Sequence, residues 1–223
     1  MPAVPPASFP FRAVIFDMDG VIVDTEAYYT EELGAYARYL GIEVSRDELN
    51  EQVGKSHQDF CALMVDWLGR AGRTATVAKA LDAYEAWVAD KPCDYAALLN
   101  PGAAETFAGL RERGVRVALA SSSPLANIHT VLKACGLEGA FEVITSGEQF
   151  EQSKPDPEIY LHTLDVLGLP ASACCCVEDS VPGITAGKAA GLTVIAKREK
   201  RFGFSQDAAD VIIDQLPDVL KLK

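Results

Sequence analysis

Apolar residues occur along this chain in two patterns, short continuous runs and helical stripes, which alternate from about residue 101 onward. The continuous runs predict buried strands, at 13–16, 115–120, 141–145, 174–177, 193–196 and 211–213. Between them, apolar residues three or four apart predict helices, over 101–113, 124–135, 156–167, 181–190 and 216–222. Strands that alternate with helices of this length are typical of an α/β fold with a parallel, doubly wound sheet.

The stretch from residue 26 to 95 contains helical stripes and no strand-like run. A stripe from Leu33 to Leu40 ends at Gly41. Ser45 followed by Glu48 has the spacing of a capping box and predicts a short helix through residue 53. Two further helices are expected, one with its stripe at 60–68 that ends at residue 69, and one over about 76–90.

This change of pattern predicts two parts. Residues 1–25 and 96–223 should form the doubly wound core, and residues 26–95 should form an all-α cap inserted after the first strand.

Charge and composition exclude several classes of function. Twenty basic against 32 acidic residues give a net charge of −12, which argues against a nucleic-acid partner. No apolar run reaches about 18 residues, so no membrane span is expected. The first ten residues are proline-rich and lack the apolar core of a signal peptide. The consecutive cysteines 174–176 fit a buried strand in a reducing compartment. We expect a cytoplasmic monomer.

Two carboxylates, Asp17 and Asp19, directly follow the first predicted strand, and Gly20 comes next. Open α/β sheets place their chemistry at the carboxyl ends of parallel strands. Two acids at such a place repel each other unless a cation or a shared proton lies between them. The pair therefore indicates a Mg²⁺ site beside a nucleophilic carboxylate. The alternative interpretation is a plain turn at the end of a strand, where Asp and Gly are common.

Three other polar groups fall at corresponding places, namely Ser121, Lys154 and the pair Glu178–Asp179. Each has a purely structural alternative: a helix cap for the serine, a solvated loop for the lysine, and a helix start for the acid pair. Because all carboxyl ends of a parallel sheet lie on one edge, we expect these groups to meet. Together they indicate Mg²⁺-dependent phosphoryl transfer, in which lysine and hydroxyl groups hold the transferring phosphoryl oxygens.

Four segments carry a resemblance to a known family: FDMDGVIVDTE, LASSS, SKPDP and VEDSVPGITAGKAAG. In this order they resemble the four motifs of the haloacid dehalogenase superfamily. The helical segment after the first motif is similar to the cap of the subgroup that contains β-phosphoglucomutase and sugar-phosphate phosphatases. The resemblance covers nearly the whole chain from residue 11 on.

The resemblance assigns roles to these positions. It implies that Asp17 is the nucleophile and Asp19 the general acid and base, while Ser121 and Lys154 hold the phosphoryl group, with Ser122 beside them. It also implies a Mg²⁺ site, formed by Asp17, the Asp19 carbonyl, Glu178 and Asp179. The dehalogenases of the superfamily lack the second acid of the first motif, so the presence of Asp19 argues against a dehalogenase.

Within this subgroup, the mutases carry a histidine twelve residues after the nucleophile, where this chain has Tyr29. That difference favours hydrolysis, and the stretch ALASSSPL resembles bacterial hexose- or hexitol-phosphate phosphatases. We expect a phosphatase for a small sugar or polyol phosphate, with a β-phosphoglucomutase-like mutase as the alternative. In the cap, Lys55 and His57 are candidate substrate contacts, or otherwise a loop residue and a helix start.

A phospho-acceptor receiver domain is a rival from another class of function. It also combines a doubly wound sheet with an acidic pocket, Mg²⁺, a hydroxyl and a lysine. Such a module needs only about 120 residues and has no helical insertion here, so we expect an enzyme.

Overall fold

The computed structural model describes residues 9–223 of the chain. Residues 1–8 lie outside the described part, so the expectation that the first ten residues are not a signal peptide stays a prediction. The described residues form a six-stranded sheet in which every neighbouring pair is parallel, in the order β3-β2-β1-β4-β5-β6. The strands are β1 (Ala13–Phe16), β2 (Arg116–Ser121), β3 (Val143–Ser146), β4 (Cys174–Glu178), β5 (Thr193–Lys197) and β6 (Val211–Ile213). The predicted parallel α/β fold is confirmed.

Strand β1 lies in the middle of the sheet and is buried on both faces, which explains its continuous apolar run. Val14 and Phe16 pack into the hydrophobic core on one face. Ala13 and Ile15 pack into the core on the other face, together with Cys176 of β4. The three consecutive cysteines of β4 are fully buried, as the sequence predicted, and alternate between the two cores.

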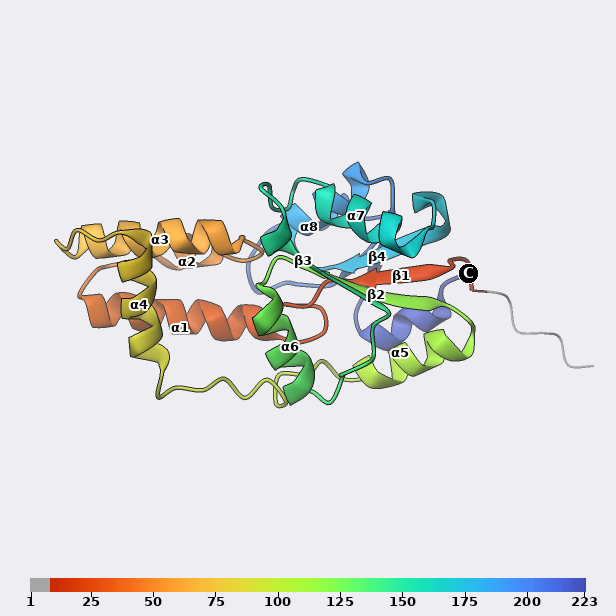
Figure 1. The fold of residues 1–223 in the computed structure, drawn as a ribbon, viewed down its shortest axis with the longest axis horizontal. Coiled ribbons are helices and arrows are strands. Elements are labelled where there is room, and N and C mark those ends of the chain that lie inside the picture. Colours follow the sequence, from red (N-terminus) through yellow and green to blue (C-terminus); the bar gives the residue numbers. More distant parts are fainter. Residues whose placement is uncertain (1–8) are drawn as a thin grey trace, which may run out of the picture.

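Helices cover both faces of the sheet (Figure 1). One layer consists of α5 (Ala103–Glu112), α6 (Leu125–Ala134) and the 3₁₀ helix η3 (Leu216–Lys221). The other consists of α7 (Glu158–Leu167) and α8 (Val181–Ala189). Two short 3₁₀ turns, η1 (Gly147–Gln149) and η2 (Ala171–Ala173), complete the core.

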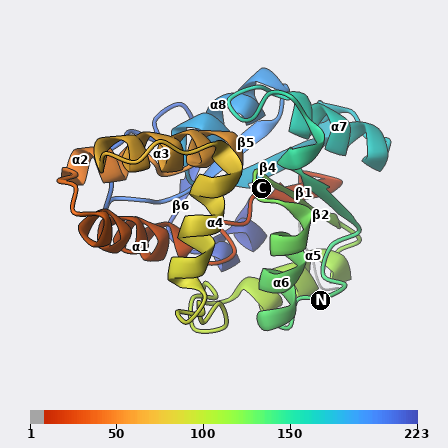
Figure 2. The same cartoon turned by 60° about the vertical axis from the view of Figure 1, so that its left-hand side comes forward.

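Four helices between β1 and α5 form a separate bundle, which we call the helical insertion (Figures 1 and 2). They are α1 (Thr25–Leu40), α2 (Arg46–Asn50), α3 (His57–Arg70) and α4 (Val77–Val88). The insertion has its own hydrophobic core, in which Tyr36, Met64 and Trp67 are fully buried. This agrees with the predicted helical pattern, while the domain limits at 25/26 and 95/96 stay a prediction.

The two connections of the insertion lie side by side. Val23 forms an antiparallel bridge with Leu99. The backbone N–H of Asp24 donates to the carbonyl of Leu98, at 2.8 Å. In addition, the side-chain amide of Asn100 donates to the carbonyl of Val21, at 2.7 Å. The chain thus leaves and re-enters the core through one short, hydrogen-bonded pair of segments.

Several predicted boundaries differ from those in the structure. Ser121 does not cap a helix, because β2 continues through it and α6 begins only at Leu125. Ser45 does accept from the backbone of Glu48, but the short helix ends at residue 50 rather than 53. The helix predicted to end at residue 69 continues to Arg70, and the last helix is a 3₁₀ helix. Within residues 9–223, no helix combines the length and apolarity required to cross a bilayer.

Candidate active site

The register of the sheet places the predicted polar groups at one edge. Phe16 of β1 pairs with Leu119 of β2 on one side and with Val177 of β4 on the other. The next residues of these strands are therefore level with each other, and the backbone N–H of Asp17 donates to the carbonyl of Val177, at 3.0 Å. Four sequence-predicted groups meet here: Asp17, Ser121, Lys154 and the pair 178–179.

Lys154 connects the two acidic motifs. Its Nζ lies 2.7 Å from Oδ1 of Asp17 and 2.7 Å from Oε1 of Glu178, and it donates to the carbonyl of Ala120 at 3.0 Å. The lysine is buried, so the interpretation as a solvated loop residue is wrong. Burial by itself lowers the pKa of Lys154, but the two carboxylates outweigh this effect and raise the pKa above its usual value.

The carboxylates of Asp17, Glu178 and Asp179 form a compact acidic cluster, with one oxygen from each residue within 4.8 Å of the others. Glu178 is fully buried, and its Oε1 accepts hydrogen bonds from Lys154 and from the hydroxyl of Tyr160. Its Oε2 and Oδ2 of Asp179 are buried and accept no hydrogen bond within the described residues. A buried carboxylate oxygen without a partner is costly, so these atoms fit a site for a cation.

Two glycines make room for this cluster. A Cβ at Gly20 would overlap with the carboxylate of Asp179, and a Cβ at Gly183 would overlap with that of Glu178. Gly20 also has a φ of +76°, which other residues rarely adopt. Three hard oxygen donors, two of them without hydrogen-bond partners, match the ligand preference of Mg²⁺.

Asp19 faces a different direction from the acidic cluster. Its Oδ1 accepts from the hydroxyl of Thr25 at 2.6 Å, and its Oδ2 accepts from the hydroxyl of Ser123 at 2.9 Å. The side chain of Asp19 therefore does not belong to the acidic cluster formed by residues 17, 178 and 179. A metal contact through its main-chain carbonyl stays a prediction.

Burial dominates the acid–base properties of this site. It raises the pKa of Asp17 to about 7, although Lys154 lowers the pKa and thereby offsets part of the effect, while Glu178 raises it further. Burial also raises the pKa of Asp19, against the hydrogen bonds from Thr25 and Ser123. A raised pKa favours the protonated form of Asp19, which is the form that a general acid needs.

A cavity of about 520 Å³ lies between the core and the helical insertion and contains the predicted phosphate-binding groups. Its volume is within the usual range for small-molecule sites. Ser121 and Ser122 line it from the core, and Lys55 and His57 line it from the insertion, where both are exposed. Ser121 is buried, and its Oγ accepts from the backbone N–H of Ser123 at 3.1 Å.

The insertion touches the core close to the acidic cluster. Gly54, with a φ of +72°, lies against Ser180, so that a Cβ on Gly54 would be 2.6 Å from the Cβ of Ser180. Its backbone N–H donates to Oε1 of Glu26, at 3.2 Å. Glu26 is buried, and burial, followed by the charges of Asp19 and Asp17, raises its pKa to about 8. Glu26, Gly54 and Ser180 all line the cavity.

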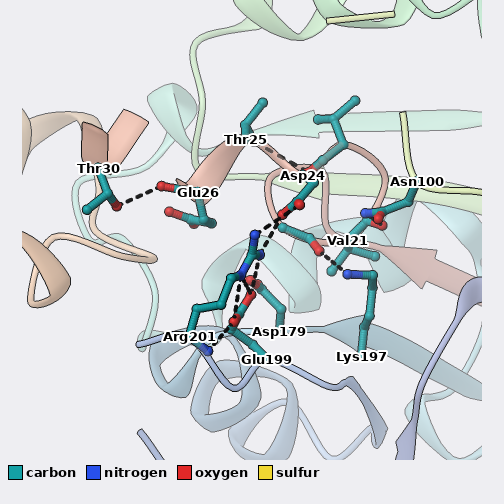
Figure 3. Close-up of polar contacts among 12 residues, drawn as sticks. Val21, Asp24, Thr25, Glu26, Thr30, Asn100, Asp179, Lys197, Glu199 and Arg201 are labelled. Carbon is teal, nitrogen blue, oxygen red and sulfur yellow. Dashed lines mark hydrogen bonds and ion pairs between the residues drawn. The ribbon is translucent and has the colours of Figure 1, made fainter. Parts of the chain in front are cut away.

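Sequence reasoning missed some of these residues. Glu26 belongs to the first motif and is the first residue of the predicted cap, which could have marked it as a contact between the two parts. Arg201 lies outside all four motifs, yet it reaches from the segment after β5 to Asp24 and Glu199 (Figure 3). No sequence signal identifies such a residue, because its role depends on how a distant loop folds back.

Comparison with known proteins supports the resemblance that the four sequence motifs indicated. The chain is 33% identical over 221 residues to hexitol phosphatase B of Escherichia coli K12, with 93% of each chain covered. It is 27% identical to the β-phosphoglucomutase of Bacillus subtilis, over 93% of this chain and 91% of that one. Among solved structures, CbbY of Rhodobacter sphaeroides in complex with phosphate matches with a TM-score of 0.74 and 25% identity, over 95% of this chain and all of that one.

The family comparison covers most of the chain, and named phosphatases are among the relatives, so this is an enzyme of the phosphatase type. Residues 11–191 match the haloacid dehalogenase-like hydrolases, and the chain belongs to this family.

Proposed function

We propose that this enzyme hydrolyses the phosphate ester of a small sugar or polyol, with Asp17 as the nucleophile and Mg²⁺ as cofactor. One observation carries the proposal: Lys154 holds only Oδ1 of Asp17, at 2.7 Å, within a cavity large enough for a small phosphorylated substrate. The remaining oxygen, Oδ2, is then available to attack phosphorus. The relationship to hexitol phosphatase B supports the choice of a polyol or sugar ester.

In the first step, Asp17 attacks phosphorus and forms an aspartyl phosphate, while the bond from phosphorus to the leaving oxygen breaks. Asp19 donates its proton to that oxygen, which leaves as an alcohol. In the second step, Asp19 takes a proton from water, and the resulting hydroxide attacks phosphorus. The bond from phosphorus to the Asp17 oxygen breaks, inorganic phosphate leaves, and both carboxyl groups return to their starting protonation states.

The other residues stabilise charge around these steps. Lys154 and the hydroxyl and backbone N–H groups at 121–122 would bind the phosphoryl oxygens. Asp17, Glu178 and Asp179 would hold Mg²⁺, together with the main-chain carbonyl of Asp19. When bound, the metal supplies positive charge that offsets the repulsion between the substrate and the acidic cluster.

The experiment is a phosphate-release assay on a panel of sugar and polyol phosphates, with Mg²⁺ or with a chelator. We expect wild type to release phosphate only with Mg²⁺, and Asp17→Asn to release none. Asp165→Asn is the matched control, because this carboxylate is exposed and does not line the cavity. Phosphate release that persists in Asp17→Asn would refute the assignment of Asp17 as the nucleophile.

The same assay separates the alternative, a sugar phosphomutase. A mutase would convert a hexose 1-phosphate to the 6-phosphate with little free phosphate. Tyr29 occupies the position of the mutase histidine, and its hydroxyl lies 3.2 Å from that of Tyr95. A tyrosine pair therefore occupies the position where the mutases carry an imidazole. If conversion to the 6-phosphate dominates over phosphate release, the mutase replaces the phosphatase as the proposed function.

A further inference from the structure

The wall of the cavity that the insertion contributes contains a carboxylate that the proposed mechanism does not use. Glu32, on α1, is half-buried and lines the cavity with Tyr28 and Tyr84. Its Oε2 accepts from the hydroxyl of Tyr28 at 3.0 Å, and its Oε1 accepts from the hydroxyl of Tyr84. We call these three residues the Glu32 wall.

The two phenols of the Glu32 wall stay protonated over the whole working range of pH. Burial raises the pKa of Tyr84, and the hydrogen bond to Glu32 raises it further; the same causes act on Tyr28. Each phenol donates its hydroxyl hydrogen bond to Glu32, so its oxygen is left as an acceptor. A carboxylate has about four acceptor positions, of which the phenols use two. The wall thus offers acceptors and needs donors from a ligand.

Two lysines of the insertion, Lys55 and Lys91, line the cavity with Glu32, and among the described residues neither forms an ion pair with it. Within residues 9–223, none of the ion pairs includes Glu32. The Nζ of Lys91 donates to the carbonyl of Trp87 and lies 3.1 Å from Oδ1 of Asp90. A second anionic group on a substrate would therefore meet a carboxylate without an ion-pair partner at this wall.

We propose that the Glu32 wall selects monophosphate esters whose leaving group is an uncharged polyol, and rejects those that carry a second anion at the distal end. The inference rests on the proposed function and narrows its substrate class. Hydroxyl groups donate to the acceptors of the wall. A distal carboxylate or second phosphate cannot donate, and it is also repelled by Glu32, since like charges in a shielded site oppose binding strongly.

A matched pair of substrates tests this selection. Glucitol 6-phosphate and 6-phosphogluconate have the same six-carbon chain and differ at the distal carbon, which is a hydroxymethyl group in the first and a carboxylate in the second. We expect kcat/KM of wild type to favour the polyol at least about tenfold. In Glu32→Gln the ratio should fall to within about threefold, mainly because 6-phosphogluconate improves, since the new amide can donate to its carboxylate.

Glu31→Gln is the control for this substitution. It removes a neighbouring charge from the same helix, but the Glu31 side chain is 67% exposed and pairs with Arg46 outside the cavity. The substrate ratio should stay at its wild-type value in this variant. Equal use of both substrates by wild type, or a ratio that Glu32→Gln leaves unchanged, overturns the inference.

A binding experiment separates this inference from the proposed function. In Asp17→Asn, which should not turn over, glucitol 6-phosphate is expected to raise the melting temperature more than 6-phosphogluconate does. Equal shifts, or no shift with either ligand, overturn the selection. Should wild type release no phosphate from any ester, the proposed function fails, while this comparison still decides what the Glu32 wall binds.

Discussion

The guanidinium of Arg201 forms a bidentate ion pair with the carboxylate of Asp24, with Nη1 3.0 Å from Oδ2 and Nη2 2.6 Å from Oδ1 (Figure 3). Its Nε also donates to Oε1 of Glu199, at 3.0 Å. Asp24 occupies the N-cap position of α1, yet its side chain makes no capping hydrogen bond. Arg201 therefore ties the start of the helical insertion to the segment that follows β5.

Loss of this contact should loosen the start of the insertion. We expect Arg201→Ala to lower the free energy of unfolding by about 1 kcal/mol. The bidentate geometry strengthens the ion pair, but its partial exposure to solvent weakens it. Because Arg201 links the core to the start of the insertion, which lines the cavity, we expect kcat and KM to change together. Urea denaturation and steady-state kinetics measure the two effects. Arg198→Ala, which removes the exposed pair with Asp214, should change neither.

Asp19 should act in both chemical steps. Asp19→Asn is expected to reduce hydrolysis of a sugar phosphate by a factor of about 10² to 10⁴. With p-nitrophenyl phosphate, whose leaving group needs no proton, the first step should survive while the second stays slow. A burst of nitrophenol and a trapped phosphoenzyme are then expected in rapid-quench experiments. A variant that turns over both esters at the wild-type rate would exclude this role.

The contact between Gly54 and Ser180 should be needed for the insertion to close over the cavity. Gly54→Ala places a methyl group 2.6 Å from the Cβ of Ser180, so we expect kcat/KM to fall by roughly tenfold or more. Gly72→Ala is the matched control: its φ of +73° imposes the same backbone strain, but no atom lies within 4 Å of the new methyl group. Similar kinetics in the two variants would refute a steric role for Gly54.

Glu26 should make the metal-free protein less stable as pH rises. Its pKa is raised from 4.5 to about 8, so the folded state binds this proton more tightly than the unfolded state. Glu26 thus favours folding at low pH, and this contribution is lost between about pH 4.5 and 8. Glu26→Gln should be more stable than wild type at pH 8, by on the order of 4 kcal/mol, and lose this advantage near pH 4.5. Urea denaturation in the presence of a chelator measures the difference, and parallel pH profiles for the two proteins would contradict the assignment.

The parts of the fold that depend on local sequence were predictable. The run at 13–16 became β1 without a change of boundary, because a central strand is buried on both faces and shows this in its composition. Gly41 and Gly168 end α1 and α7 with positive φ values of 73° and 61°, as their positions indicated. Boundaries failed where tertiary pairing overrode local preference, as at Ser121, which pairs with Ser146 of β3.

The candidate site was predictable only as far as strand ends define it. The sheet topology brings Asp17, Lys154 and Glu178 together, and this follows from the alternation of strands and helices. The Glu32 wall does not follow from any motif, because Glu32 and Tyr84 lie 52 residues apart on two helices of the insertion. Their contact depends on how those helices cross, which periodicity alone does not specify.

The bridge between Val23 and Leu99 also bears on how such a protein can change over time. The segment between these two residues contributes no strand to the six-stranded sheet, so its replacement leaves the strand order unchanged. Glu32 and Tyr84 lie inside that segment, whereas Asp17, Lys154 and Glu178 lie outside it. Substitutions in this one module can therefore change which ester enters without altering the residues that we propose cleave the ester.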